Sequence, residues 1–142
     1  MSETEPQREA DQLAGVALPE QARLVVGHLP ARTTLAELIG ASRIPGGILL
    51  HGPRGIGKAT LAFDVAREIL TRTGDEDAER VAEQVHAVSH PNLFVLRRQP
   101  RETGRGFYTV IRVDDIRALK ERMQRTRGRA GFRVAIIDAI DD

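Results

Sequence analysis

A group of glycines around one lysine is the feature of this sequence that most directly suggests chemistry. The segment follows the pattern G-x-x-x-x-G-K-[ST] at every position but the last. Glycines reach backbone angles that other residues avoid, so such a loop can wrap a phosphate with its N–H groups pointing inward. The start of the next helix adds positive charge. The predicted phosphate-binding residues are Gly52, Pro53, Arg54, Gly55, Ile56, Gly57, Lys58, Ala59 and Thr60.

One position of this loop departs from the pattern. Ala59 stands where a Ser or Thr hydroxyl normally ligates Mg²⁺. Thr60 is the next residue, but it is rotated by about 100° around the helix and is not expected to substitute. We therefore expect ATP or ADP to bind with a weakened or altered Mg²⁺ arrangement. ATP binding that gains as much from Mg²⁺ as it does in an Ala59→Thr variant would contradict this.

The second half of the expected site is an apolar run that ends in an aspartate. Residues 133–138 read Arg-Val-Ala-Ile-Ile-Asp, and a buried strand that delivers Asp138 at its carboxyl end suits a metal-holding strand. Asp138 is thus the predicted metal ligand. Many ATPases of this type place Glu after that Asp to position water, but this chain has Ala139. Hydrolysis is therefore expected to be slow or absent, and no residue is predicted to be catalytic.

Other candidate residues are read as structural. His28, His51 and His90 are expected to pack or cap, and His86 to lie on the surface of a helix. The four histidines are not at ligand spacing, and the chain has no cysteine, so no zinc site is expected. Between Phe94 and Ile137 there are 12 Lys or Arg against 4 Asp or Glu, a local net charge of +8. A solvated face or a protein interface is the preferred explanation, with DNA contact left open.

The elements expected to position these residues alternate between strands and helices. Residues 48–50 and 93–96 are continuous apolar runs typical of buried strands in a parallel sheet. Residues 132–137, apolar except for Arg133, are expected to form a third strand. Helices are expected from Thr33 or Thr34 to Gly40, after Lys58 to about Leu70, in a short stretch ending the acidic segment 73–83, and at 111–123. Residues 97–106 are expected to form a basic loop.

The composition suits one globular domain. With 142 residues, 41% of them apolar, the chain can bury one core, and it contains no apolar stretch of about 18 residues for a membrane span. Residues 1–20 are polar and are expected to form a disordered tail, followed by the domain proper at 21–142. Because there is neither a signal peptide nor a cysteine, a cytoplasmic location is expected.

Several segments together resemble the delta-prime subunits of bacterial DNA polymerase III clamp loaders. They are Val26–His28, Leu50–Ala62, the His90-Pro91-Asn92-Leu93 turn, 111–117 and 133–139. The resemblance implies an α/β fold of the three-layer P-loop NTPase (AAA+) type, with a parallel sheet between helices, here truncated after the Walker B strand. It also implies that Lys58 is the phosphate-binding lysine, that Asp138 is the acidic strand-end residue, and that Val26–His28 lies near the adenine.

The same resemblance implies a role in DNA replication. Such subunits belong to a hetero-pentamer with other clamp-loader subunits, which loads the sliding clamp onto primer-template DNA. The chain would be a nucleotide-binding component of the polymerase holoenzyme with little or no ATPase activity. The four-cysteine zinc module of many relatives is absent. Residues after 142 would carry the sensor strand, arginine finger, lid and collar, so an exposed sheet edge is expected to promote association.

Two other functions share the same loop. One is an active AAA+ ATPase, such as the clamp-loader motor subunit or a helicase-type motor, against which Ala59 and Ala139 argue. The other is a P-loop kinase for a nucleotide or metabolite, which would be expected to have Ser or Thr at position 59. Steady-state ATP turnover distinguishes the first of these from a non-hydrolysing subunit.

Overall fold

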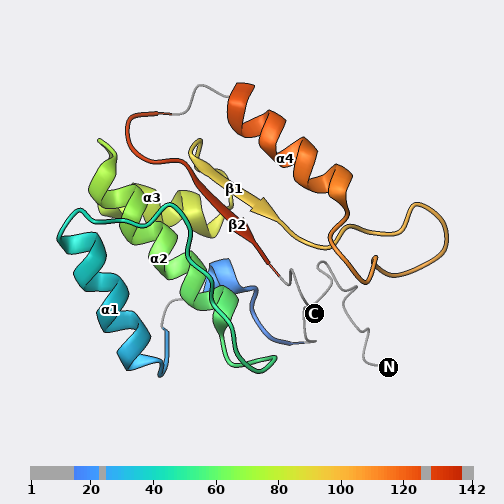
Figure 1. Ribbon diagram of the computed structural model, residues 1–142, viewed down its shortest axis with the longest axis horizontal. Coiled ribbons are helices and arrows are strands. Elements are labelled where there is room, and N and C mark those ends of the chain that lie inside the picture. The colour runs from blue at the N-terminus through green and yellow to red at the C-terminus, as the bar shows by residue number, and fades with distance from the viewer. Residues whose placement is uncertain (1–14, 23–24, 126–128, 139–142) are drawn as a thin grey trace.

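A short parallel sheet lies between helices in the computed structural model, which describes residues 15–22, 25–125 and 129–138 (Figure 1). The elements in chain order are the 3₁₀ turn η1 (Pro19–Gln21), α1 (Leu29–Gly40), α2 (Lys58–Thr73), α3 (Ala78–His86), β1 (Leu93–Leu96), α4 (Val113–Arg125) and β2 (Val134–Ile137). The order strand–helix–strand in parallel, with helices on both sides, confirms the predicted α/β sheet-between-helices architecture.

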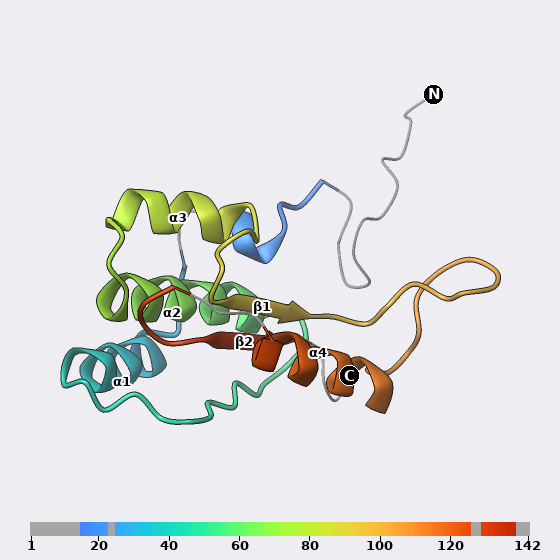
Figure 2. The ribbon, with the colours of Figure 1, turned by 90° about the horizontal axis from the view of Figure 1, so that it is seen from above.

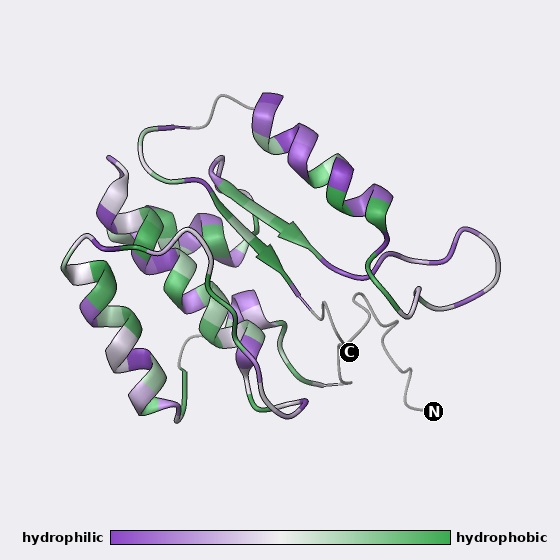
Figure 3. Cartoon of the chain, viewed as in Figure 1, coloured by the Kyte–Doolittle hydropathy of each residue, from purple (hydrophilic) through white to green (hydrophobic). Residues whose placement is uncertain are grey.

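Strands β1 and β2 pair in parallel over their whole length. Leu93 is in register with Val134, and Leu96 with Ile137. Successive side chains of a strand point to opposite faces, so each strand supplies two different cores. Leu93 and Ile136 join the larger core, while Phe94 and Leu96 join the smaller one. Figure 3 shows both strands as apolar along their length, as expected of a sheet covered on both faces.

Helices α2 and α3 cover one face of the sheet and α4 covers the other (Figure 2). The larger core fills the space under α2 and α3 with the fully buried side chains of Phe63, Val81 and Val85. The smaller core joins Leu119 of α4 to β1. Helix α4 is hydrophilic over much of its length in Figure 3, in keeping with a helix that buries only one narrow stripe.

Helix boundaries follow local chemistry. Gly57, at a positive φ of 95°, precedes α2, and Gly74 follows it, so the helix starts and stops at glycines. The Asp77 side chain accepts the Arg80 N–H at 2.9 Å and caps α3. At α4 the Asp115 carboxylate reaches back to the Arg112 N–H at 3.0 Å, which is half of a capping box. These three helices were predicted close to their observed positions.

Two predictions about the first third of the chain are wrong. Residues 48–50 form no strand in the described structure, and Ile48 and Leu49 are 40% and 76% exposed, because an apolar run becomes a strand only when another strand pairs with it. Helix α1 begins at Leu29, well before Thr33. At the boundary between the expected tail and the domain, Glu20 is buried in η1, which packs on α2 and α3. Residues 1–14 lie outside the described structure.

Candidate nucleotide-binding site

The predicted phosphate loop is an open turn that leads into α2. Gly52, Gly55 and Gly57 all have positive φ angles, of 147°, 82° and 95°, a backbone region in which other residues are strained. A Cβ at Gly52 would lie 2.7 Å from the tip of the flexible Ile56 side chain, which would have to move aside. No side chain caps the start of α2. The first N–H groups of the helix therefore remain directed toward the loop, as anion binding requires.

Lys58 closes this loop on itself. Its Nζ atom donates a hydrogen bond to the Gly52 carbonyl oxygen at 2.7 Å, joining the first residue of the loop to the first residue of α2. An ammonium group has three donors, so this bond leaves Lys58 able to donate to a phosphate as well. The lysine that the pattern singled out is thus held at the mouth of the glycine loop.

His28 touches the loop from the other side. It is the N-cap residue of α1, in the left-handed conformation at φ 53°, and its Nε2 contacts the Ile56 carbonyl oxygen. Because a carbonyl only accepts, Nε2 carries the hydrogen in this contact. A Cβ added at Gly57 would lie 3.8 Å from the same nitrogen. The sequence pattern predicted a packing or capping histidine, and its contact with the loop was missed.

Lys58, Ala59 and Asp138 line one cavity of about 280 Å³. The cavity lies between α2, β2 and the segment from Ile44 to Leu50. The lysine of the loop and the aspartate at the end of the acidic strand therefore line the same cavity. Thr60 is not among the described residues that line this cavity.

Asp138 faces a buried arginine. Its backbone N–H donates to the Leu96 carbonyl at 2.9 Å, which extends the pairing of the two strands by one step. Its Oδ2 atom lies 3.5 Å from Nε of Arg97, the residue after β1. Arg97 also binds Glu20 through two hydrogen bonds, of 2.7 and 3.3 Å. Neither Arg97 nor Glu20 was predicted to matter, because 77 residues separate them and no local pattern links them.

These contacts bear on the expected Mg²⁺. Mg²⁺ requires about six oxygen ligands in near-octahedral geometry. Ala59 offers no oxygen, and the Asp138 carboxylate is already ion-paired with Arg97. Within the described residues, no group of three or more His, Asp or Glu side chains is placed to hold a metal ion. The donors present therefore do not fit Mg²⁺, and Asp138 as a metal ligand remains a prediction that its contacts argue against.

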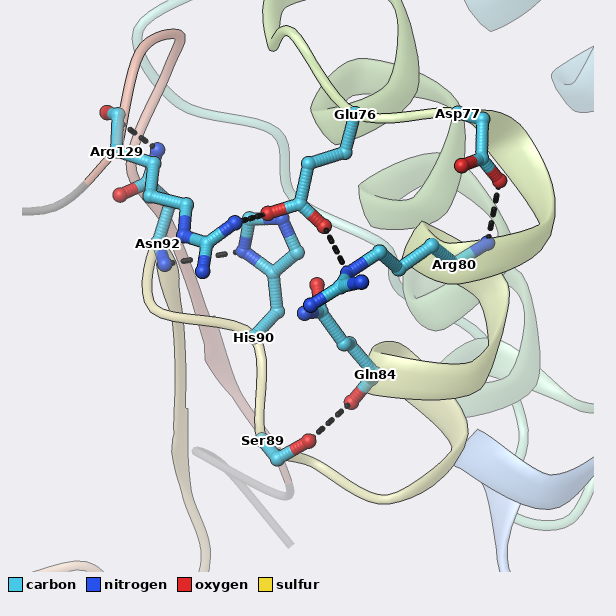
Figure 4. Close-up of polar contacts among 8 residues, drawn as sticks. All are labelled: Glu76, Asp77, Arg80, Gln84, Ser89, His90, Asn92 and Arg129. Atoms are coloured by element: carbon cyan, nitrogen blue, oxygen red, sulfur yellow. Dashed lines mark hydrogen bonds and ion pairs between the residues drawn. The ribbon is translucent and has the colours of Figure 1, made fainter.

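The His90-Pro91-Asn92 turn lies at the opposite, amino end of the strands (Figure 4). The Asn92 N–H donates to His90 Nδ1 at 3.0 Å, and its side-chain amide donates to the carbonyls of Arg129 and Ala130 at 3.0 and 3.3 Å. Burial lowers the pKa of His90, against the opposing effect of the nearby Glu76 carboxylate. The turn thus ties β1 to the segment before β2, a structural role as predicted.

The basic segment is less positive in space than in sequence. Arg97, Arg112, Arg117, Arg125 and Arg129 all form ion pairs with carboxylates. The Arg112 guanidinium also lies 4.3 Å from the centre of the Tyr108 ring, and its hydrogen bond lowers the pKa of Asp115. Three of these arginines pair with carboxylates that the segment itself contains, whereas Arg97 and Arg129 pair with carboxylates outside it. These outside pairs offset part of the local charge excess, and contact of the segment with DNA stays open.

The comparison with known proteins then decides the family. A sequence model for the family described as "DNA polymerase III, delta subunit" matches residues 28–142. The chain belongs to this family. It is also 40% identical over 72 residues to the Holliday junction branch migration complex subunit RuvB of Gluconobacter oxydans (strain 621H). That alignment covers 47% of the chain but only 21% of RuvB. No solved structure matches the chain.

The family match includes both halves of the candidate site. Residues 28–142 contain His28, the glycine loop, the His90 turn and Asp138. Within the described residues, no helix is long and apolar enough to cross a membrane. Ala139 lies outside the described residues, so the absence of a carboxylate at this position is known from the sequence alone.

Proposed function

We propose that the chain is the nucleotide-binding part of a delta-prime-type clamp-loader subunit, which binds ATP or ADP and hydrolyses little or none. The observation that carries the proposal is the cavity that Lys58 and Asp138 share with Ala59. A lysine at the mouth of a glycine loop can bind phosphate. Without the hydroxyl at 59 and a carboxylate at 139, the metal and the attacking water lack their usual partners.

The proposed cellular role follows from the family. The subunit would act in the cytoplasm during DNA replication, in a hetero-pentamer with other clamp-loader subunits that places the sliding clamp on primer-template DNA. Co-purification of the chain with the motor subunits of its own clamp loader tests this role. A chain that stays unassociated when mixed with those subunits would speak against it.

An active AAA+ motor is the second candidate, because 72 residues are 40% identical to RuvB. The two candidates predict different ATP turnover. A non-hydrolysing subunit should show no steady-state turnover above that of a Lys58→Ala variant. Turnover that depends on Lys58 would favour the motor. A P-loop kinase would require phosphate transfer to a second substrate, and no observation favours it.

A further inference from the structure

Three segments that are distant in the sequence converge on the Arg97 guanidinium. Glu20 comes from η1, Arg97 follows β1 and Asp138 follows β2. The three side chains are only 5%, 11% and 22% exposed, respectively. The guanidinium also lies 5.5 Å from the centre of the Phe63 ring in the larger core. Buried charges persist only when they are paired, so each member of this trio depends on the others.

The trio fixes a positive charge next to the candidate nucleotide cavity. Asp138 belongs to both, since its side chain pairs with Arg97 and the residue also lines the cavity with Lys58. The two hydrogen bonds that Arg97 donates to the Glu20 carboxylate hold the guanidinium in one orientation. Because Glu20 is itself buried, Arg97 cannot turn toward solvent without leaving a buried carboxylate unpaired.

We propose that Arg97 is a built-in cation that takes the place of a divalent metal ion beside Asp138, so that this site accepts metal-free nucleotide. A metal ion approaching Asp138 would meet a like charge that is already bonded there. Glu20 is then a positioning residue for Arg97. The inference rests on the proposed nucleotide binding. The missing hydroxyl at Ala59 only removes a ligand for the metal, whereas the Arg97 guanidinium would actively exclude it.

The two explanations of metal independence predict different variants. If Ala59 alone were responsible, an Ala59→Thr substitution would make ATP binding depend on Mg²⁺. If Arg97 excludes the metal, Ala59→Thr should leave the affinity for ATP equal in Mg²⁺ and in EDTA. Only the double variant A59T/R97Q should then bind ATP more tightly with Mg²⁺. Arg101→Gln, in the exposed loop that follows, is the matched control for loss of an arginine.

The experiment is a titration of each full chain with ATP, in Mg²⁺ and in EDTA, by isothermal calorimetry. The expected result is metal-independent affinity in the wild type, Ala59→Thr and Arg101→Gln. Metal-dependent affinity in the wild type, or in Ala59→Thr alone, overturns the proposal. Since Arg97→Gln removes the charged partner of the buried Glu20 carboxylate, circular dichroism must show that the double variant is folded. If the double variant is not folded, the titration of Ala59→Thr in Mg²⁺ and in EDTA tests the proposal by itself.

Mn²⁺ as a paramagnetic probe separates this inference from the proposed function. If no variant binds ATP, the proposed function fails, but ¹⁵N NMR with Mn²⁺ alone still tests Arg97. Removing the guanidinium leaves Glu20 and Asp138 as two neighbouring carboxylates, a favourable ligand pair for a divalent ion. Mn²⁺ should broaden the Asp138 amide in Arg97→Gln and leave it sharp in the wild type and in Arg101→Gln. Broadening in the wild type overturns the proposal.

Discussion

The two ends of the short sheet carry motifs that look equally distinctive in the sequence but differ in structure. At the carboxyl end, the glycine loop is exposed and its helix start is uncapped. At the amino end, the His90-Pro91-Asn92 turn is largely buried, and the Asn92 N–H and side-chain amide N–H groups donate hydrogen bonds to His90 and to the Arg129 carbonyl. An open set of donors is suited to a ligand, whereas a set satisfied internally is suited to holding the fold together.

Asp138 combines features of both ends. It lines the open cavity, yet its carboxylate is paired with a buried arginine. The comparison teaches that a residue which matches a motif at a strand end is not necessarily available to bind a ligand. Its neighbours in space determine what it can bind. The variants below test whether the carboxyl end is a binding site and the amino end a structural joint.

The largest effect on stability is expected at Arg97. Replacing it with Gln removes the charged partner of the buried Glu20 carboxylate and the ion pair with Asp138, which should lower the free energy of unfolding by about 3–5 kcal/mol. Urea unfolding followed by circular dichroism measures the change, with Arg101→Gln as the control. Equal stability of the two variants would mean that the ion-pair trio does not hold in solution.

A smaller loss is expected at the amino end. Asn92→Ala removes the amide that binds the carbonyls of Arg129 and Ala130, which should cost about 1–3 kcal/mol of stability. Affinity for ATP should not change in molecules that remain folded. The exposed Ser89→Ala is the control in the same turn. A loss of ATP affinity without a loss of stability would contradict the division between the two ends.

At the carboxyl end, His28 should affect binding more than stability. His28→Ala removes the contact with the Ile56 carbonyl that supports the loop, so the dissociation constant for ATP should rise about fivefold, or about 1 kcal/mol. His51→Ala, an exposed histidine just before the loop, provides the comparison by the same titration. If both variants bind ATP like the wild type, His28 does not support the loop.

The smallest expected effect is on pH dependence. Burial lowers the pKa of His90 below its ordinary 6.5, so the unfolded chain binds this proton more readily than the folded one. The neutral His90 side chain therefore makes its full contribution to the free energy of unfolding above about pH 6.5. That contribution is lost as the pH falls through the pKa of His90 in the folded chain. His90→Asn keeps an acceptor near the Asn92 N–H and should flatten this part of the profile. An unchanged slope between pH 5 and 7 would show that His90 does not titrate as described.

The sequence predicted the elements whose signals are local. Helices α2 and α4 and the two strands follow from apolar patterns and neighbouring residues within a few positions, and α3 was expected as a short helix at the end of the acidic segment 73–83. The strand expected at 48–50 failed because pairing depends on a partner that the pattern of three residues cannot show. In the candidate site, Lys58 and Asp138 were found by motif. Arg97, Glu20 and the loop contact of His28 depend on contacts between distant segments and could not be read from the sequence.

The central claim is that the glycine loop binds nucleotide through Lys58. Titration of the folded chain with ATP, with and without Mg²⁺ and beside a Lys58→Ala variant, tests it most directly. The account predicts binding that Lys58→Ala abolishes and that Mg²⁺ does not strengthen. Absence of binding in a folded wild-type chain, or equal binding by Lys58→Ala, would contradict it and leave the chain a scaffold without a working phosphate loop.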